Sequence, residues 1–286
     1  MAKIKIVTDT SSGISQEEAK TLGIGVVPMP INIEGTEYLD GINLFYDEAV
    51  ERIQNGEIFK TSQPLPKDVI EAWEEALKDH DYVLYFPISS GISGSCVNAY
   101  TIAQNYDGKV IVVDNKSVEC LLRVNVLEAL EMVKAGYEAQ EIKEIMEADF
   151  KDNYAIIIPE SVEALKRGGR ITPAVAALAG LLKICPLIKV SLGNLDLFDK
   201  VRTFKKAVAN AIDAVVETEL DKSEYHWLML SVGFSKEEEE QFLESYRNAL
   251  GSDDIKIFHF TPIVMAHTGN RTIGFCYTRK HHIEAK

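Results

Sequence analysis

Short apolar runs alternate with segments of helical periodicity through the first half of the chain. The predicted strands span residues 3–8, 25–33, 82–88 and 109–113, all rich in β-branched side chains. Between them, apolar residues recur at helical spacing from Val69 to Leu77, and residues 117–135 predict a helix that Gly136 ends. Apolar strands that alternate with helices are typical of a parallel sheet covered on both faces. We therefore predict an α/β fold for this half.

A polar break at residues 150–153 separates this half from a second one with the same alternation. The predicted strands of the second half span residues 154–158, 227–232, 255–260 and 272–277. An amphipathic helix is predicted over residues 203–219. We place the domain boundary at the break, which predicts an N-terminal domain of residues 1–153 and a C-terminal domain of residues 154–286.

Two helix starts are marked by their capping residues. Thr172 before Pro173 predicts a helix start, and Ser235 with Glu238 forms the pattern of a capping box. The most apolar stretch, residues 174–190, contains two lysines and a proline. A membrane span needs ~20 apolar residues, so a buried helix and a buried strand fit this stretch better.

Charge and cysteine usage narrow the classes of function. Lys and Arg number 30 against 44 Asp and Glu, a formal net charge of −14, which disfavours nucleic acid and anionic membrane surfaces as partners. The four cysteines lie far apart with no C-x-x-C pair, so neither a disulfide framework nor a zinc cage is predicted. We predict a cytoplasmic protein that does not insert stably in a membrane.

Several motifs of catalysis and cofactor binding are incomplete. The stretch Gly91-Ile92-Ser93-Gly94-Ser95 departs from the nucleophile elbow G-x-S-x-G at its last position. No P-loop is present, and Gly-Ile-Gly at residues 23–25 lacks the third glycine of a dinucleotide loop. The tandem histidines at residues 281–282 have no partners at metal-ligand spacing. We therefore predict neither a metal nor a cofactor.

Four short polar segments stand beside apolar structure. They are Thr-Ser-Gln-Pro at 61–64, Ser-Ser-Gly-Ile-Ser-Gly-Ser at 89–95, the cationic stretch 165–171 and residues 264–269. Hydroxyls and amides at a strand-to-helix loop can hold an anion, and an arginine beside a helix start suits a carboxylate or phosphate. The plainer alternatives are a helix cap, a capped loop, a solvated surface and a structural histidine, respectively.

The order and content of these segments resemble a known family. The matching stretches are IVTDTSSGIS at the start, TSQP at 61–64, PISSGISGSCVNA at 87–99, VDNKS at 113–117, SVEALKRGGRIT at 161–172, VRTFKKA at 201–207 and HTGNRTIGF at 267–275. Together they resemble the DegV family of bacterial fatty-acid-binding proteins, which includes the carrier subunits of fatty acid kinase. The resemblance covers nearly the whole chain.

This resemblance implies a fold, a ligand and a partner. The fold would be a two-domain α/β architecture with an N-terminal parallel sheet and a C-terminal mixed sheet. The ligand would be a long-chain fatty acid in a buried apolar pocket. The chain would be a carrier and not itself an enzyme, because a separate fatty acid kinase catalytic subunit would supply the ATP site. The carrier would present the carboxylate to that kinase and take the acyl phosphate onward to phospholipid synthesis.

The resemblance also assigns residues to the site. The carboxylate-binding residues would be Thr61, Ser62, Ser93, Gly94, His267 and Thr268. Arg170 would lie near the head group or its phosphate, and Arg202 would dock the kinase.

Two segments depart from the family's pattern. After the histidine, Gly269-Asn270-Arg271 replaces a Gly-Pro-Gly-like turn, and we expect Asn270 to tolerate the left-handed backbone of that turn. Residues 119–123 are bulkier than the family's small residues, which affects the shape of the pocket.

Two alternatives remain open at this point. One is a serine hydrolase or thioesterase with Ser93 as nucleophile and His267 as base. The other is a regulatory module that binds a different small anion.

Overall fold

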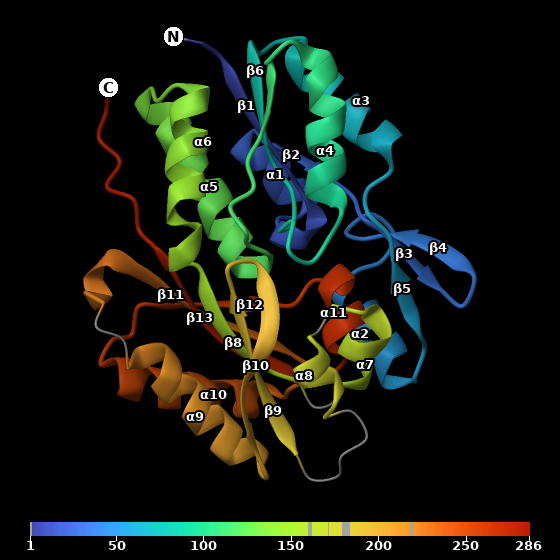
Figure 1. The fold of residues 1–286 in the computed structure, drawn as a ribbon, viewed down its shortest axis with the longest axis vertical. Coiled ribbons are helices and arrows are strands. Elements are labelled where there is room, and N and C mark those ends of the chain that lie inside the picture. Colours follow the sequence, from blue (N-terminus) through green and yellow to red (C-terminus); the bar gives the residue numbers. More distant parts are fainter. Residues whose placement is uncertain (1, 160–161, 171, 179–183, 218–219) are drawn as a thin grey trace.

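Three sheets organise the computed structural model, which describes residues 2–159, 162–170, 172–178, 184–217 and 220–286. In Figure 1 a four-stranded sheet with its helices occupies the upper part of the molecule, and a six-stranded sheet occupies the lower part. A small three-stranded sheet lies beside their junction. This arrangement confirms the predicted α/β fold with a parallel and a mixed sheet.

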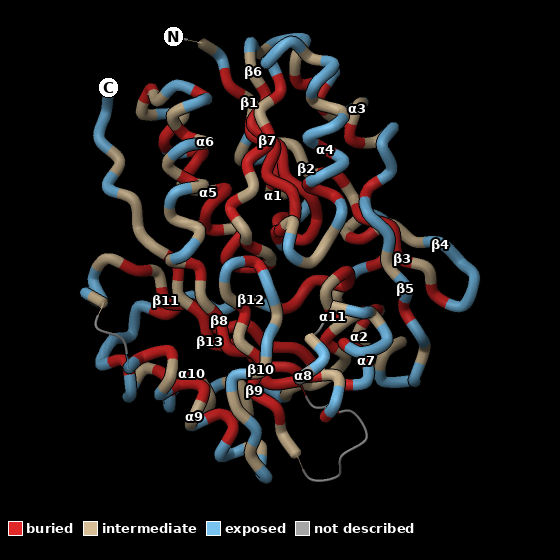
Figure 2. Tube along the Cα trace, in the orientation of Figure 1, coloured by how far each residue is buried: buried red, intermediate tan, exposed pale blue. Residues whose placement is uncertain are grey.

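The four-stranded sheet is parallel throughout and covered on both faces. Its strand order is β2 (Gly25–Val27), β1 (Ile4–Asp9), β6 (Tyr82–Phe86) and β7 (Val110–Val112). One face packs on α3 (Pro66–Leu77) and α4 (Ser95–Ala103). The other face packs on α1 (Gln16–Leu22), α5 (Glu119–Ala135) and α6 (Ala139–Ala148). Its central strands β1 and β6 are buried along nearly their whole length, as their continuous apolar sequence requires (Figure 2).

The six-stranded sheet is mixed, with only β11 and β12 parallel among its described pairs. Its order is β10 (Asn194–Val201), β9 (Cys185–Ser191), β8 (Tyr154–Ile158), β13 (Thr272–Arg279), β11 (Tyr225–Val232) and β12 (Ile255–His259). Helices α9 (Phe204–Val216) and α10 (Lys236–Leu250) cover its outer face. The predicted capping box of Ser235 and Glu238 begins α10, and Gly251 ends it in the left-handed conformation.

The inner face of the six-stranded sheet packs on elements from both halves of the chain. From the second half come α7 (Glu163–Gly168), α8 (Pro173–Ala176) and α11 (Pro262–Thr268). From the first half come α2 (Tyr46–Gln54) and the antiparallel sheet of β4 (Thr36–Leu39), β3 (Pro30–Ile33) and β5 (Phe59–Thr61). The boundary between residues 153 and 154 stays a prediction, and residues 30–61 pack mainly beside the second half.

The predicted strand over residues 25–33 is wrong as a single element. It is two strands, β2 and β3, that belong to different sheets. Pro28 and Pro30 have no N–H to donate to a ladder, and between them the Met29 N–H donates to Thr10 Oγ1 at 3.1 Å. The chain therefore leaves the first sheet at Pro28.

The apolar stretch 174–190 contains the end of α8 and most of β9, while residues 179–183 lie outside the described residues. Thr172 occupies the N-cap of α8, but its hydroxyl bonds Asp196 Oδ1 at 2.8 Å instead of capping the helix. The helix predicted over 203–219 is α9 (Phe204–Val216), and residues 218–219 lie outside the described residues. No helix of the described residues is long and apolar enough to cross a membrane.

Two buried carboxyls tie the first half of the chain to the start of α11. Asp40 accepts a hydrogen bond from the Ile263 N–H at 3.4 Å. Glu119 accepts two from Thr261, from its N–H at 2.9 Å and its hydroxyl at 2.8 Å. Burial raises the pKa of Asp40 to about 7 and the pKa of Glu119 to about 8. Both groups therefore hold protons in the folded chain at pH values where ordinary carboxyls have lost them.

We expect the free energy of unfolding to fall as the pH rises from 5 toward 8. The two folded-state pKa values lie above the ordinary values of 3.8 and 4.5. The stability that these groups contribute is therefore complete below pH ~4 and is lost as the pH rises through the folded values. Asp40→Asn cannot ionise and should reduce the loss between pH 5 and pH 8 by roughly 2 kcal/mol in urea denaturation. Asp213→Asn, at an exposed position on α9, is the control and should lose as much stability between pH 5 and pH 8 as the wild type. If Asp40→Asn also loses as much as the wild type, the raised pKa of Asp40 is contradicted.

Candidate functional site

An apolar cavity of about 850 Å³, its open mouth included, lies against the inner face of the six-stranded sheet. Apolar residues from both halves of the chain line it, including Ile88, Leu121, Ile157, Val190, Leu230 and Ile263. An apolar lining with a few polar side chains is typical of a small-molecule pocket. A ligand in this cavity would touch both halves at once.

Polar residues gather in the lining of the same cavity. They are Thr61, Ser62, Gln63, Ser93, Glu119, Arg170, His267 and Thr268. All but Gln63 and Glu119 were predicted as site residues from the sequence. Gln63 stands within the predicted Thr-Ser-Gln-Pro segment, and its Oε1 accepts a hydrogen bond from Asn98 Nδ2 at 2.8 Å. The remaining predicted carboxylate-binding residue, Gly94, is the N-cap of α4 and does not appear in the described lining.

The central polar contact joins residues 206 positions apart. Thr61 Oγ1, at the end of β5, lies 2.8 Å from His267 Nε2 in α11. His267 Nδ1 is buried without a hydrogen-bond partner, and it faces Gly168 so closely that a Cβ on that glycine would overlap it. Burial, and then the charge of Arg170, lowers the pKa of His267 to about 4. The imidazole is therefore neutral near pH 7.

The proton of this neutral imidazole is assigned by its surroundings. A buried N–H without a partner would cost more than a bare nitrogen against a glycine Cα–H. We therefore place the proton on His267 Nε2, which donates to Thr61 Oγ1. The Thr61 hydroxyl hydrogen is then free to be donated to a ligand in the cavity.

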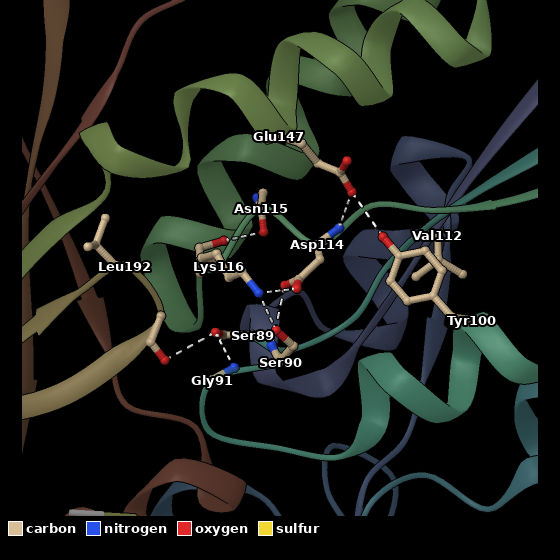
Figure 3. A network of polar contacts seen from close by, with 12 residues as sticks. Ser89, Ser90, Gly91, Tyr100, Val112, Asp114, Asn115, Lys116, Glu147 and Leu192 are labelled. Atoms are coloured by element: carbon tan, nitrogen blue, oxygen red, sulfur yellow. Dashed lines mark hydrogen bonds and ion pairs between the residues drawn. The ribbon is translucent and has the colours of Figure 1, made fainter. Parts of the chain in front are cut away.

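The loop of residues 89–95 divides into two parts with different tasks. In its first part, Ser89 Oγ bonds the Gly193 carbonyl at 3.3 Å, and the Gly91 N–H bonds Ser89 Oγ at 3.1 Å (Figure 3). Gly193 lies in the turn between β9 and β10. This part of the loop therefore docks the tip of that hairpin.

A charged pair supports the docked loop from the other side. Asp114 accepts from the Ser90 N–H at 3.3 Å and pairs with Lys116, whose ammonium also contacts the Ser90 hydroxyl (Figure 3). Neither Ser89 nor Ser90 belongs to the described cavity lining. Part of the serine-rich loop is therefore structural, which corrects the view of the whole loop as an anion cradle.

In the second part of the loop, Ser93 does line the cavity. Its Oγ lies 2.8 Å from Ser95 Oγ and accepts from the Ser95 N–H at 3.2 Å, at the start of α4. This geometry disagrees with a hydrolase site. Among the described residues, Ser93 has no hydrogen bond to His267, and no carboxylate orients the imidazole.

The two predicted arginines lie in different surroundings. Arg170 follows α7 and lines the cavity; its Nε donates to the Ile92 carbonyl at 3.3 Å, and its guanidinium also contacts the Gly168 carbonyl. It thus connects the cationic segment to the loop of Ser93. Arg202 is exposed between β10 and α9 and is not part of the described cavity lining. A site for a metal is not found either, because no group of three His, Cys, Asp or Glu among the described residues is suitably arranged.

The turn after His267 differs from expectation. Gly269 and Arg271 have positive φ, 76° and 53°, whereas Asn270 was expected to carry the left-handed backbone. Arg271 also has an evident role: its guanidinium bonds Glu238 at 2.9 Å and lies 4.6 Å from the Phe234 ring centre. It therefore attaches this turn to the first turn of α10.

The bulky segment 119–123 affects the cavity through two of its members. Glu119 and Leu121 line the cavity. Leu122 packs on the opposite side, in the core of the four-stranded sheet, and Arg123 pairs with Glu18. Of this segment, one apolar and one carboxyl side chain thus contribute to the shape of the pocket.

Comparisons with known protein sequences agree with one another. The sequence model of the DegV family, described as "Uncharacterised protein, DegV family", matches residues 3–280. A DegV domain-containing protein of Staphylococcus aureus (strain MRSA252) is 30% identical over 284 residues, which cover 98% of this chain and 100% of that protein.

Solved structures resemble the whole chain. A DegV family protein from Thermus thermophilus, described by its fatty acid binding, has a TM-score of 0.86 and 27% identity, covering 97% of this chain and 100% of that one. A fatty acid binding DegV family protein from Streptococcus agalactiae has a TM-score of 0.88 and 25% identity, covering 98% and 100%. The chain thus shares its fold with proteins described as fatty acid binders.

We expect Gly91→Ala to destabilise the protein by about 1–3 kcal/mol, because overpacking at a close contact forces the neighbours apart. A Cβ at this position would overlap the Gly193 carbonyl oxygen. Gly94→Ala is the matched control: its φ is −74° and its new Cβ would meet Gln63 Oε1 at 3.4 Å, an ordinary contact. The control should lose no more than about 1 kcal/mol, because Gly is preferred over Ala at an N-cap but no atom is displaced. Equal losses in urea denaturation would show that the hairpin tip does not press on the loop.

Proposed function

The chain belongs to the DegV family, and from this premise we propose that it binds a long-chain fatty acid in the apolar cavity. The observation that carries the proposal is the Thr61–His267 contact, a hydrogen-bonded pair of neutral groups in the lining of an apolar pocket. The fatty acid binding described for the relatives from T. thermophilus and S. agalactiae supports it.

In such a complex, the tail and the head group of the fatty acid would contribute differently to the free energy of binding. Burying a palmitate-sized tail of ~14 methylenes is worth ~11 kcal/mol at ~0.8 kcal/mol each. Association costs something like 4–15 kcal/mol, so the tail supplies most of the affinity. An unpaired buried carboxylate costs several kcal/mol, so hydrogen-bond donors decide the orientation of the ligand.

We assign these donors to the polar part of the lining. The Thr61 hydroxyl, polarised by His267, donates to one carboxylate oxygen, and the Ser93 hydroxyl donates to the other. Thr268 and Ser62 lie in the same lining, and Arg170 adds positive charge. Because Thr61, Ser93 and His267 are neutral, the same group can hold a carboxylate or an acyl phosphate, with Arg170 offsetting the greater charge of the phosphate.

We further propose that the chain works as a carrier for a separate fatty acid kinase. The kinase would phosphorylate the bound carboxylate, and the acyl phosphate would travel on this chain to phospholipid synthesis in the cytoplasm. The exposed segment of residues 200–206, with Arg202 and three lysines on a chain of net charge −14, supports a docking role.

Fatty acid occupancy tests the binding site. Native mass spectrometry of the purified protein should show about one long-chain fatty acid per chain, released on denaturation. Thr61→Val keeps the shape but removes the donor, and it should weaken fatty acid binding tenfold to a hundredfold. Thr101→Val, whose hydroxyl bonds the Val97 carbonyl of its own helix, is the matched control. An empty protein that also refuses added fatty acids would refute the proposal, and uptake of a different anion would favour a regulatory module.

Docking is tested separately from binding. Arg202→Ala should lower acyl phosphate production by the cognate kinase about tenfold, because a charge at the rim of an interface acts mainly on association. Fatty acid occupancy should stay at the wild-type level. Lys20→Ala removes an exposed charge on α1 and should leave production unchanged. Unchanged production in Arg202→Ala would exclude this arginine from docking.

A further inference from the structure

A buried carboxyl group lies among the apolar residues of the cavity. Glu119, the first residue of α5, is 3% exposed and lines the cavity beside Val118 and Leu121. It also lines a second hollow of about 940 Å³, its open mouth included, and thus forms part of the wall between the two. The carboxylate-binding role proposed above does not use this group.

The two carboxyl oxygens of Glu119 differ in their hydrogen bonds. Oε1 accepts both the Thr261 N–H at 2.9 Å and the Thr261 hydroxyl at 2.8 Å. Oε2 has no hydrogen-bond partner among the described residues. Two donors on one oxygen occupy both of its lone pairs, so when the group is protonated Oε1 is its carbonyl oxygen.

The protonation of Glu119 follows from its surroundings. Burial, and to a lesser degree the nearby carboxyl of Asp40, raises the pKa of Glu119 to about 8. The group is therefore a neutral carboxylic acid near pH 7. Because Oε1 is the carbonyl oxygen, the proton sits on Oε2, which becomes a hydrogen-bond donor without a partner on the described chain.

The position of this donor is far from the head group. Thr261 precedes the first turn of α11, whereas His267 lies in its last turn. Six residues at 1.5 Å each place these two positions roughly 9 Å apart along the helix. A fatty acid whose carboxylate is near His267 would therefore bring the middle of its chain, not its head, to Glu119.

The backbone of Glu119 supports a special role for the position. Its φ is +58°, in the left-handed region that few residues other than glycine and asparagine adopt. Such a conformation costs on the order of 1–3 kcal/mol and persists only where the surroundings enforce it. The fold thus holds a polar side chain in an apolar lining at a local cost.

We propose that Glu119 makes the pocket selective for fatty acids that carry an oxygen substituent, a hydroxyl or keto group, in the middle of the chain. This inference rests on the proposed fatty acid binding. An unsubstituted chain leaves the Oε2 donor unpaired in the cavity, whereas an oxygen on the chain accepts its hydrogen bond. A site built to hydrogen-bond a ligand group discriminates against analogues that lack it.

The test compares stearic acid with hydroxystearic acids whose hydroxyl is moved carbon by carbon along the middle of the chain. Affinities are measured on the delipidated full chain by displacement of a fluorescent fatty acid. One positional isomer should bind about tenfold more tightly than stearic acid, which corresponds to one hydrogen bond. The ketostearic acid with its oxygen at the same carbon should share this preference, because it accepts the same bond.

Variants assign the preference to this residue. Glu119→Met should bring the ratio of the two affinities to about one without weakening stearic acid. Glu119→Gln, whose amide offers an acceptor to Thr261 and a donor to the ligand, should retain a preference. Asp40→Asn is the matched control, because Asp40 is a buried carboxyl outside the lining of the first cavity, and its ratio should equal that of the wild type.

The outcomes separate the two levels of the proposal. Stearic acid binding with equal affinity for every isomer overturns the inference and leaves fatty acid binding intact. A preference that survives in folded Glu119→Met also overturns it. Failure of both stearic and hydroxystearic acids to bind refutes the proposed function itself. If Glu119→Met does not fold, the ratio of the two affinities is compared between the wild type and Glu119→Gln. A preference in both supports the inference, and a ratio of about one in either overturns it.

Discussion

The inner face of the six-stranded sheet is a surface that its own half of the chain covers only in part. Apolar side chains such as Ile157, Val190 and Leu230 project from it, and residues of the first half, among them Phe59 and Leu121, complete their packing. Burial of this shared face stabilises the association of the two halves. The cavity is the space that this packing leaves open. Its polar contacts exist only when the halves are joined, because they link residues as distant as Thr61 and His267.

Elements with strong local signals could be predicted from the sequence. The capping box at Ser235 begins α10 as expected, and the apolar strands form the parallel sheet. Elements whose state depends on distant partners could not. The strand β3 follows the break at Pro28, and it belongs to a separate sheet because it pairs with β4 and β5. The strand β10 pairs with its neighbour β9, and its alternation of polar and apolar residues is a local signal that the sequence analysis did not use.

The candidate site shows the same division. Hydroxyl, histidine and arginine positions were recognised because short motifs contain them, but their distances depend on tertiary packing. Glu119 was noticed only as a bulky residue; its burial and its bonds to Thr261 link positions 142 residues apart. The serines of the loop 89–95 look alike in the sequence, yet Ser89 docks a hairpin and Ser93 faces the cavity. Identical residue types in one loop thus take different roles because different distant segments reach them.

Because the tip of the β9–β10 hairpin is docked on the loop of residues 89–95, this turn should not accept insertions. Turns between strands usually accept insertions, because they project into solvent. Gly35, in the turn between β3 and β4, fits that description, with no atom near the position of a side chain. Gly193 is buried against Ser89 and Lys116 instead, so an added residue there would displace the loop that carries Ser93. We therefore expect the length of this turn to vary as little among relatives as the identity of a core residue does, although the turn lies outside the cavity.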